Sequence, residues 1–340
     1  MPRQSDSSPC CLTGLPPASI PGMSSAAALA ATSTSGDRGP VLGLCCQFSD
    51  ASPRFRRATA TYVLRLTPAH RREYLADVTA ANAIALLHAI ERCAALGIGA
   101  FRIPSQIVPL ATHPTAGVEL HELPNASAVI DAFAAARWLA GHHGIRLSFH
   151  PDQFVVLGSA RGDVVAASLR EMDHHGAIAA LVGADTICLH GGGQVGGAEA
   201  AGARLLDGIE RLGEAARSRL ALEIDDRVWS PALLLPLCER AGVPFIYDVH
   251  HHRCLGDGTG VAEVTAASLA SWAAAGRRAY FHISSPRDGW GARDRRPHAD
   301  YVDPADFPAE WRGLDVTVDV EAKAKERAVR ALRDAVASVR

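Results

Sequence analysis

A short strand-like run that ends in a metal-competent side chain, and that recurs along the chain, is the feature that most constrains the fold. Residues 146–149 alternate polar and apolar side chains as a strand does, and Pro151 stops the run just after His150. Five further runs end in a similar way, so that the six terminal residues are His150, His190, Glu223, Asp248, His282 and Glu321. A parallel barrel gathers the carboxyl ends of its strands around one axis. The recurrence therefore predicts a barrel with one site for several metal ions.

The segments between these runs extend the pattern to an α/β fold, a single (β/α)8 TIM barrel. Strands are expected at residues 41–47, 98–103, 146–150, 184–190, 218–223, 243–248, 278–282 and 314–320. Apolar residues at helical spacing predict helices at residues 74–96, 126–142, 160–181, 198–217, 231–241, 261–275 and 322–339. Strands that alternate with helices in this way are typical of the TIM barrel. We therefore expect one barrel domain over residues 40–340.

Residues 1–39 differ from the rest of the chain. They are rich in Ser, Ala, Pro and Gly and carry no periodic apolar face, which predicts a disordered and dispensable tail rather than a targeting peptide. No apolar run reaches the length of a membrane span, so no membrane association is expected. The eight cysteines form no CxxC pair, which favours reduced thiols in a cytoplasmic protein.

The charge pattern bears on which partners the protein binds. A formal net charge of −2 argues against a protein held to DNA by bulk charge alone, although bound divalent cations would add positive charge where it touches phosphate. Residues 48–72 are expected to form a loop rich in arginine. Two readings of this loop are open: its arginines face phosphate, or they form a solvated surface.

The residue types at the strand ends point to a site with more than one ion. Histidine and carboxylate ligands suit Zn²⁺, Mn²⁺ or Fe²⁺, and the set is too large for one tetrahedral ion. Glu223 and Glu321, each at a strand end, are the natural bridging pair because one carboxylate can bind two ions. Ions held a few ångströms apart can stabilise the attacking and leaving oxygens of an in-line phosphoryl displacement.

Seven ordered motifs together resemble those of the UV damage endonuclease family, over roughly residues 41–330. They are His150-Pro151-Asp152-Gln153-Phe154, His190-Gly191-Gly192, Glu223-Ile224-Asp225-Asp226, Asp248-Val249-His250-His251, His282-Ile283-Ser284, His298-Ala299-Asp300-Tyr301 and Glu321-Ala322-Lys323. The resemblance implies a metal-dependent DNA repair endonuclease that nicks double-stranded DNA on the 5′ side of UV photoproducts and some other lesions. The barrel and metal site are also similar to those of endonuclease IV.

The resemblance also implies roles for individual residues. The metal ligands would be His150, His190, Glu223, Asp248, His251, His282, His298 and Glu321. They would hold two or three divalent ions, with Mn²⁺ favoured and Zn²⁺ or Mg²⁺ as alternatives. His113 would lie near the scissile phosphate and, with Glu223 and Glu321, take part in catalysis, while Gln153 and Phe154 would probe the DNA for lesions. A monomer is expected.

Three positions depart from the family pattern, which usually has Tyr, Tyr and Lys where this chain has Phe154, Leu44 and Tyr280. The departures leave two alternatives to nicking. One is a damage-binding protein that keeps its metals but cuts slowly or not at all. The other is a barrel sugar isomerase or epimerase, which also places Glu, Asp and His at strand ends around metal.

Overall fold

The computed structural model describes residues 39–338. Within them, parallel strands close into a barrel in chain order, because the first strand pairs with both the second and the last. The strands are β1 (Val41–Cys45), β2 (Ala100–Ile103), β3 (Arg146–Phe149), β4 (Thr186–His190), β5 (Leu220–Glu223), β6 (Phe245–Asp248), β7 (Tyr280–Ile283) and β8 (Thr317–Val320). The predicted (β/α)8 architecture is confirmed. The tail predicted for residues 1–39 lies outside the described residues except for Gly39.

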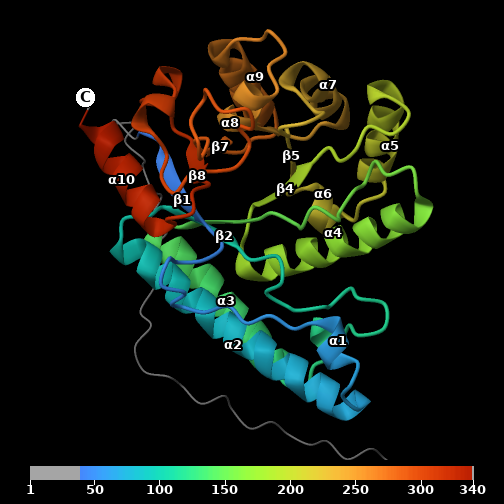
Figure 1. The fold of residues 1–340 in the computed structure, drawn as a ribbon. Coiled ribbons are helices and arrows are strands. Elements are labelled where there is room, and N and C mark those ends of the chain that lie inside the picture. The colour runs from blue at the N-terminus through green and yellow to red at the C-terminus, as the bar shows by residue number, and fades with distance from the viewer. Residues whose placement is uncertain (1–38, 339–340) are drawn as a thin grey trace, which may run out of the picture. The chain divides into compact units, whose positions relative to one another are not determined.

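Helices follow the strands and surround the barrel (Figure 1). The longer ones are α2 (Pro68–Ala95), α3 (Ala126–His143), α4 (Gly162–Val182), α5 (Ala198–Glu210), α7 (Pro231–Ala241), α9 (Val261–Ala274) and α10 (Glu326–Ala337). The short ones are α1 (Ala60–Val63), α6 (Glu214–Arg217) and α8 (Val249–Cys254), with 3-10 turns at Leu120–Glu122, Pro304–Asp306 and Ala309–Trp311. None of the helices in the described part of the chain is long and apolar enough to cross a membrane.

Several predicted boundaries were wrong, for local reasons. The helix expected from residue 74 begins at Pro68, because Thr67 accepts a hydrogen bond from the His70 amide and so caps an earlier first turn. The single helix expected at 198–217 is two, since the chain leaves α5 at Arg211 and restarts α6 after Gly213. The last helix begins at Glu326 because Lys325 has φ 56°, outside the helical region.

Glycines set the start of three strands. Gly144, Gly183 and Gly242 end α3, α4 and α7 in the left-handed conformation, with φ of 65°, 75° and 65°. Glycine adopts this conformation without a Cβ penalty, so the helix stops and the chain turns into the next strand within a few residues. The placement of the functional strand ends therefore depends partly on these stops at the opposite end of the barrel.

The strands are buried on both faces, as in other parallel sheets covered by helices. Large aromatic side chains fill the layer between barrel and helices. Trp272 of α9 is fully buried, and its indole Nε1 donates to the Phe245 carbonyl of β6 at 2.8 Å. Such a side chain fastens a helix to a strand by packing and by a hydrogen bond together.

We predict that Trp272→Ala lowers the free energy of unfolding by about 3–5 kcal/mol, because it opens a large cavity between α9 and β6. Denaturant titration followed by circular dichroism measures the change. Trp138→Ala is the matched control, because Trp138 on α3 is 67% exposed and its removal opens no cavity. Equal effects of the two substitutions would contradict the assignment of Trp272 to the core.

Candidate metal centre

Glu223 lies at the centre of a cluster of imidazoles at the carboxyl end of the barrel. It is the last residue of β5 and is 1% exposed. Its Oε2 lies 3.1 Å from His150 Nε2 and 3.7 Å from His190 Nε2. Its Oε1 lies 2.7 Å from His282 Nδ1 and 3.6 Å from His251 Nδ1. Because the two oxygens face different pairs of imidazoles, this carboxylate would offer one oxygen to each of two ions.

Glu321, which follows β8, has a similar arrangement and approaches the same nitrogen of His282 as Glu223 does. Its Oε1 lies 3.7 Å from His282 Nδ1, and its Oε2 lies 3.7 Å from His298 Nδ1. His298 comes from the long segment between β7 and β8, where it forms an antiparallel bridge with Pro286. The Glu321 carboxylate therefore also faces two imidazoles from different elements.

Asp248 completes the set of eight residues expected as ligands. It is the last residue of β6, and its Oδ1 accepts the His251 amide at 2.8 Å, which caps α8. Its Oδ2 lies 3.8 Å from His251 Nδ1. Short distances thus connect all eight predicted ligands into one cluster. Three groups have ligand atoms that lie within 4.8 Å of one another: His150, His190 and Glu223; Cys188, Glu223 and His282; and Glu223, Asp248 and His251.

Two buried polar atoms in this cluster have no hydrogen-bond partner among the described residues. They are Asp248 Oδ2 and His190 Nδ1. A buried carboxylate oxygen without a donor is costly in free energy, and a cation is the partner that relieves this cost. The unpaired oxygen, together with the imidazole and carboxylate donors around it, fits a site for divalent metal ions.

The ionisation of the cluster reflects its mutual contacts. Burial alone would raise the pKa of Glu223, but the imidazoles of His282 and His190 outweigh burial and hold this pKa well below its ordinary value. Burial would lower the pKa of His251, yet the carboxylates of Asp248 and Glu223 raise it to about 9. The Glu223 carboxylate therefore stays ionised and attracts positive charge, which either protons on imidazoles or metal ions can supply.

Sequence reasoning missed a buried cation beside the cluster. Arg102 of β2 has an 8% exposed side chain, and its Nε donates to Asp319 Oδ2 at 2.9 Å. Its Nη1 donates to Glu321 Oε1 at 2.7 Å, and its Nη2 lies 2.9 Å from His282 Nε2. Arg102 thus fixes the orientation of two predicted ligands. The signal in the sequence was an Arg in β2 and an Asp in β8, each inside a short strand buried on both faces, where a charge requires a partner.

Tyr280, one of the departures from the family pattern, belongs to the same network. Its hydroxyl donates to Asp319 Oδ1 at 2.9 Å and accepts from Ser148 Oγ at 3.0 Å. Burial raises the pKa of Tyr280 well above its ordinary value, so the hydroxyl stays protonated and able to donate. Cys188, expected only as a small apolar residue, donates from Sγ to Glu223 Oε2 at 2.9 Å.

The other predicted site residues lie around the cluster rather than in it. Gln153 and Phe154 are exposed, Phe154 by 76%, which excludes a core role for this ring. Gln153 lines an open cavity of about 480 Å³ together with His150, His190 and His251. His113 lines a separate cavity of about 740 Å³, and its Nδ1 accepts the Ala116 amide at 3.1 Å. In the described structure no hydrogen bond or ion pair joins His113 to the cluster, so its role stays a prediction.

A family model with the description UV-endonuclease UvdE matches residues 40–340. The chain belongs to this family. It is 34% identical to the UV DNA damage endonuclease of Deinococcus radiodurans over 310 residues, which cover 86% of this chain and 95% of the relative. It is 30% identical to the UV DNA damage endonuclease of Bacillus velezensis, over 86% of this chain and 91% of that protein. The resemblance inferred from the seven motifs is confirmed.

Solved structures agree on the fold. The crystal structure of SacUVDE matches with a TM-score of 0.78 and 23% identity, over 88% of this chain and 99% of that chain. Endonuclease IV from Thermus thermophilus matches with a TM-score of 0.54 and 21% identity, over 74% of this chain and 94% of that chain. At these identities the likeness establishes a shared barrel and nothing about chemistry. The family match favours the endonuclease over the sugar isomerase among the readings of the sequence.

We predict that Tyr280→Phe lowers the free energy of unfolding by about 1–3 kcal/mol, because it leaves Asp319 Oδ1 and the Ser148 hydroxyl without their partner. Metal content should be retained, since Arg102 still holds Asp319 and Glu321. Denaturant titration and elemental analysis of the purified protein test both statements. Tyr62→Phe, at a 47% exposed tyrosine of α1, should change neither quantity. An unaltered stability of Tyr280→Phe would show that this network is not coupled to folding.

Proposed function

We propose that this protein is a metal-dependent endonuclease of DNA repair, which nicks double-stranded DNA on the 5′ side of UV photoproducts and some other lesions. The observation that carries the proposal is the geometry of Glu223, whose two oxygens face separate pairs of imidazoles. The names of the relatives from Deinococcus radiodurans and Bacillus velezensis support the substrate and the lesion class.

The residues of the cluster would hold two or three divalent ions. His150, His190 and Glu223 would hold one ion, and Glu223 with Asp248 and His251 would hold a second. His282, His298 and Glu321 would complete these sites or form a third. Bound ions of this kind stabilise the attacking and leaving oxygens of a phosphodiester during displacement. We favour Mn²⁺, with Zn²⁺ or Mg²⁺ as alternatives, because the ligands are nitrogen and oxygen without a committed thiolate.

The chain's own side chains would supply orientation around these ions. Arg102 holds the Glu321 carboxylate and contacts His282, so two ligands are fixed before a metal arrives. His113 would lie near the scissile phosphate, as the resemblance to the family implies. We further propose a monomer that acts in the cytoplasm, a compartment that suits the free thiols of the described cysteines.

We predict that Glu321→Gln removes at least one ion and most nicking while the barrel stays folded, because the amide cannot supply the charge that two imidazoles and Arg102 face. Elemental analysis and nicking of irradiated plasmid measure the two losses, and circular dichroism checks the fold. Glu239→Gln on α7 is the matched control, because Glu239 is exposed. Full metal content together with full nicking in Glu321→Gln would refute the assignment of this ligand.

The alternative is a protein that binds damage but cuts slowly or not at all, which the Tyr280 departure motivates. Nicking and gel-shift binding on the same lesion-bearing duplex separate the two functions. An endonuclease should convert the bound duplex to a nicked product when Mn²⁺ is present. A protein that only binds damage should still shift the duplex in the gel and should leave both strands intact with every metal ion tested.

We also propose that Gln153 and Phe154 test how readily the bases of a duplex separate. Damaged or mispaired bases cost less to unstack, and an apolar ring that enters the gap offsets part of the lost stacking. Phe154 follows His150 by four positions and exposes 76% of its surface. Its neighbour Gln153 lines the open cavity that His150, His190 and His251 also line. An exposed ring in this place is available to stack on a base, which requires a π-face and no hydroxyl.

We predict that Phe154→Ala folds with its metals intact but binds and nicks lesion-bearing duplex about 5- to 150-fold more weakly, as expected for one base–aromatic contact of about 1–3 kcal/mol. Phe154→Tyr should keep or improve both activities. Fluorescence anisotropy and nicking assays provide the measurement. Trp138→Ala, at another exposed aromatic residue, should behave as the unsubstituted protein. Lesion cutting that survives Phe154→Ala unchanged would place damage recognition elsewhere.

A further inference from the structure

The segment after β1 carries an uncompensated cluster of positive charge. Residues 51–72 include six arginines and no aspartate or glutamate. Arg54, Arg56 and Arg57 are exposed, and within residues 39–338 their guanidinium groups have no hydrogen bond or ion pair. We name residues 54–57 the arginine segment. In a protein of net charge −2, three free cations within four residues form a local site for a polyanion.

Asp50, the acidic residue nearest in sequence, does not neutralise the arginine segment. Asp50 accepts from both terminal nitrogens of Arg92, at 2.8 and 2.9 Å, so its carboxylate is already paired. Arg92 also donates to the Ser52 carbonyl and lies 4.4 Å from the ring centroid of Phe48. These contacts hold the chain that leads into the arginine segment and leave the charge of the segment itself available.

The backbone of the arginine segment is fixed by the core. Phe55 stacks on the fully buried Phe101 of β2, with ring centroids 6.1 Å apart. The buried side chain of Asn82 on α2 accepts the Arg56 amide at 2.7 Å and donates to the Arg56 carbonyl at 3.1 Å. A backbone anchored on both sides presents its arginines at defined positions, which reduces the entropy lost when they bind a ligand.

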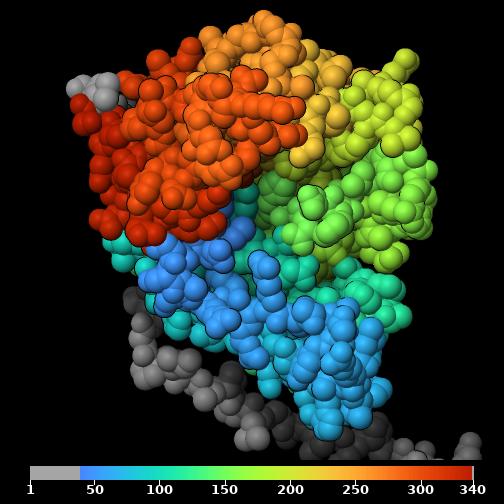
Figure 2. Space-filling view, in the orientation of Figure 1, coloured from blue at the N-terminus to red at the C-terminus, as the bar shows by residue number. Residues whose placement is uncertain are grey.

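The segment lies at the end of the barrel that carries the metal centre. It follows β1, and all parallel strands present their carboxyl ends to the same rim. The Cys46 amide donates to the Arg102 carbonyl at 3.0 Å, and Ser49 donates to the Glu326 carboxylate at the start of α10. Figure 2 shows the blue segment after β1 at the surface beside the red carboxyl-terminal part of the chain.

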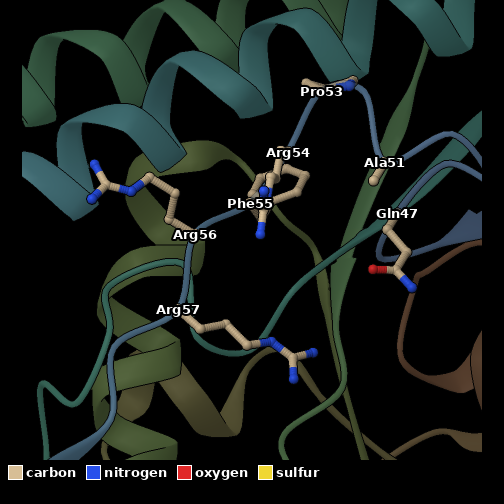
Figure 3. Close-up of a pocket in the computed structure, with 7 residues that line it drawn as sticks. All are labelled: Gln47, Ala51, Pro53, Arg54, Phe55, Arg56 and Arg57. Atoms are coloured by element: carbon tan, nitrogen blue, oxygen red, sulfur yellow. The ribbon is translucent and has the colours of Figure 1, made fainter. Parts of the chain in front are cut away.

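A cavity of about 610 Å³ opens beside the arginine segment, lined by Gln47, Ala51, Pro53, Arg54, Phe55, Arg56 and Arg57. In Figure 3 the side chains of Gln47 and Arg57 extend toward the same open space, whereas Arg56 extends in the other direction. Guanidinium groups are forks that match the oxygens of a phosphate in pairs. The lining thus combines three guanidinium groups, of which that of Arg56 extends away, with an amide, and it includes no carboxylate.

We propose that Arg54 and Arg57 bind backbone phosphates of duplex DNA next to the metal centre and supply affinity that does not depend on damage. This inference rests on the proposed function, since it names how that site holds its substrate. Phosphate contacts position a protein on DNA and carry no information about the bases. The arginine segment therefore sets orientation, and Gln153 and Phe154 discriminate lesions.

The test is the salt dependence of binding to an undamaged duplex, measured by fluorescence anisotropy with the full, Mn²⁺-loaded protein. The slope of log affinity against log salt is negative. The double variant R54Q/R57Q should reduce its magnitude by about 2, since each lost phosphate contact contributes about 0.9. Affinity at low salt should fall on the order of tenfold. Metal content should stay unchanged.

Two further variants make the result specific. R54K/R57K keeps both charges, so it should restore the salt slope even if the loss of the planar fork weakens binding. Arg240→Gln, at an exposed arginine near the carboxyl end of α7, should leave slope and affinity unaltered. A slope that falls equally in R54K/R57K would mean that the arginines act by packing, and the inference would then be wrong.

The outcome also separates this inference from the proposed function. If the unsubstituted protein nicks irradiated duplex but R54Q/R57Q retains the full salt slope, the phosphate contacts lie elsewhere and only the inference fails. If the unsubstituted, Mn²⁺-loaded protein leaves irradiated duplex intact, the proposed function fails whatever the arginine variants do.

Discussion

The burial of four carboxylates at one end of the barrel is the constraint on which the functional part of this structure depends. Glu223, Asp248 and Asp319 are at most 1% exposed, and the side chain of Glu321 is 17% exposed. Taking such groups out of water costs several kcal/mol for each ion unless positive charge lies close by. Arg102 supplies one permanent positive charge. Protonated imidazoles or metal ions must supply the rest of the positive charge that balances the four carboxylates. A barrel built in this way is therefore more stable with cations at its centre than without them.

The parallel barrel meets this constraint by separating charge from apolar packing along each strand. The strands are buried on both faces, so their inner residues must be apolar or internally paired. Charged residues are concentrated at the last position of a strand or one step beyond it, as with Glu223, Asp248 and Glu321. One exception is Asp319, which lies one residue inside β8. Its partner Arg102 comes from β2. Because Arg102 also donates to Glu321, it connects Asp319 inside the barrel to the predicted ligands at the strand ends.

The sequence predicted the features that depend on local signals and missed those that depend on distant pairing. Strand ends were found because apolar runs and the stop at Pro151 are local signals. The Arg102–Asp319 pair was missed because its members are 217 positions apart and neither lies at a strand end. His298 was inferred from family resemblance alone, since it lies in an irregular segment without periodicity. The predicted helix boundaries were wrong where a single residue decides the boundary, as at Thr67 and Lys325.

The distribution of charge suggests why an enzyme that must find rare lesions carries so little net charge. A strongly basic protein would bind undamaged DNA in many orientations, because counterion release rewards any contact between cations and phosphates. Here the formal net charge is −2, and the arginine segment places three exposed guanidinium groups within four residues after β1. Attraction to phosphate is then strongest in the orientation that also brings the cluster around Glu223 to the backbone. On our proposals, weak overall charge with a local cationic site would favour short, correctly oriented encounters, in which the exposed Phe154 would test the duplex before the protein dissociates.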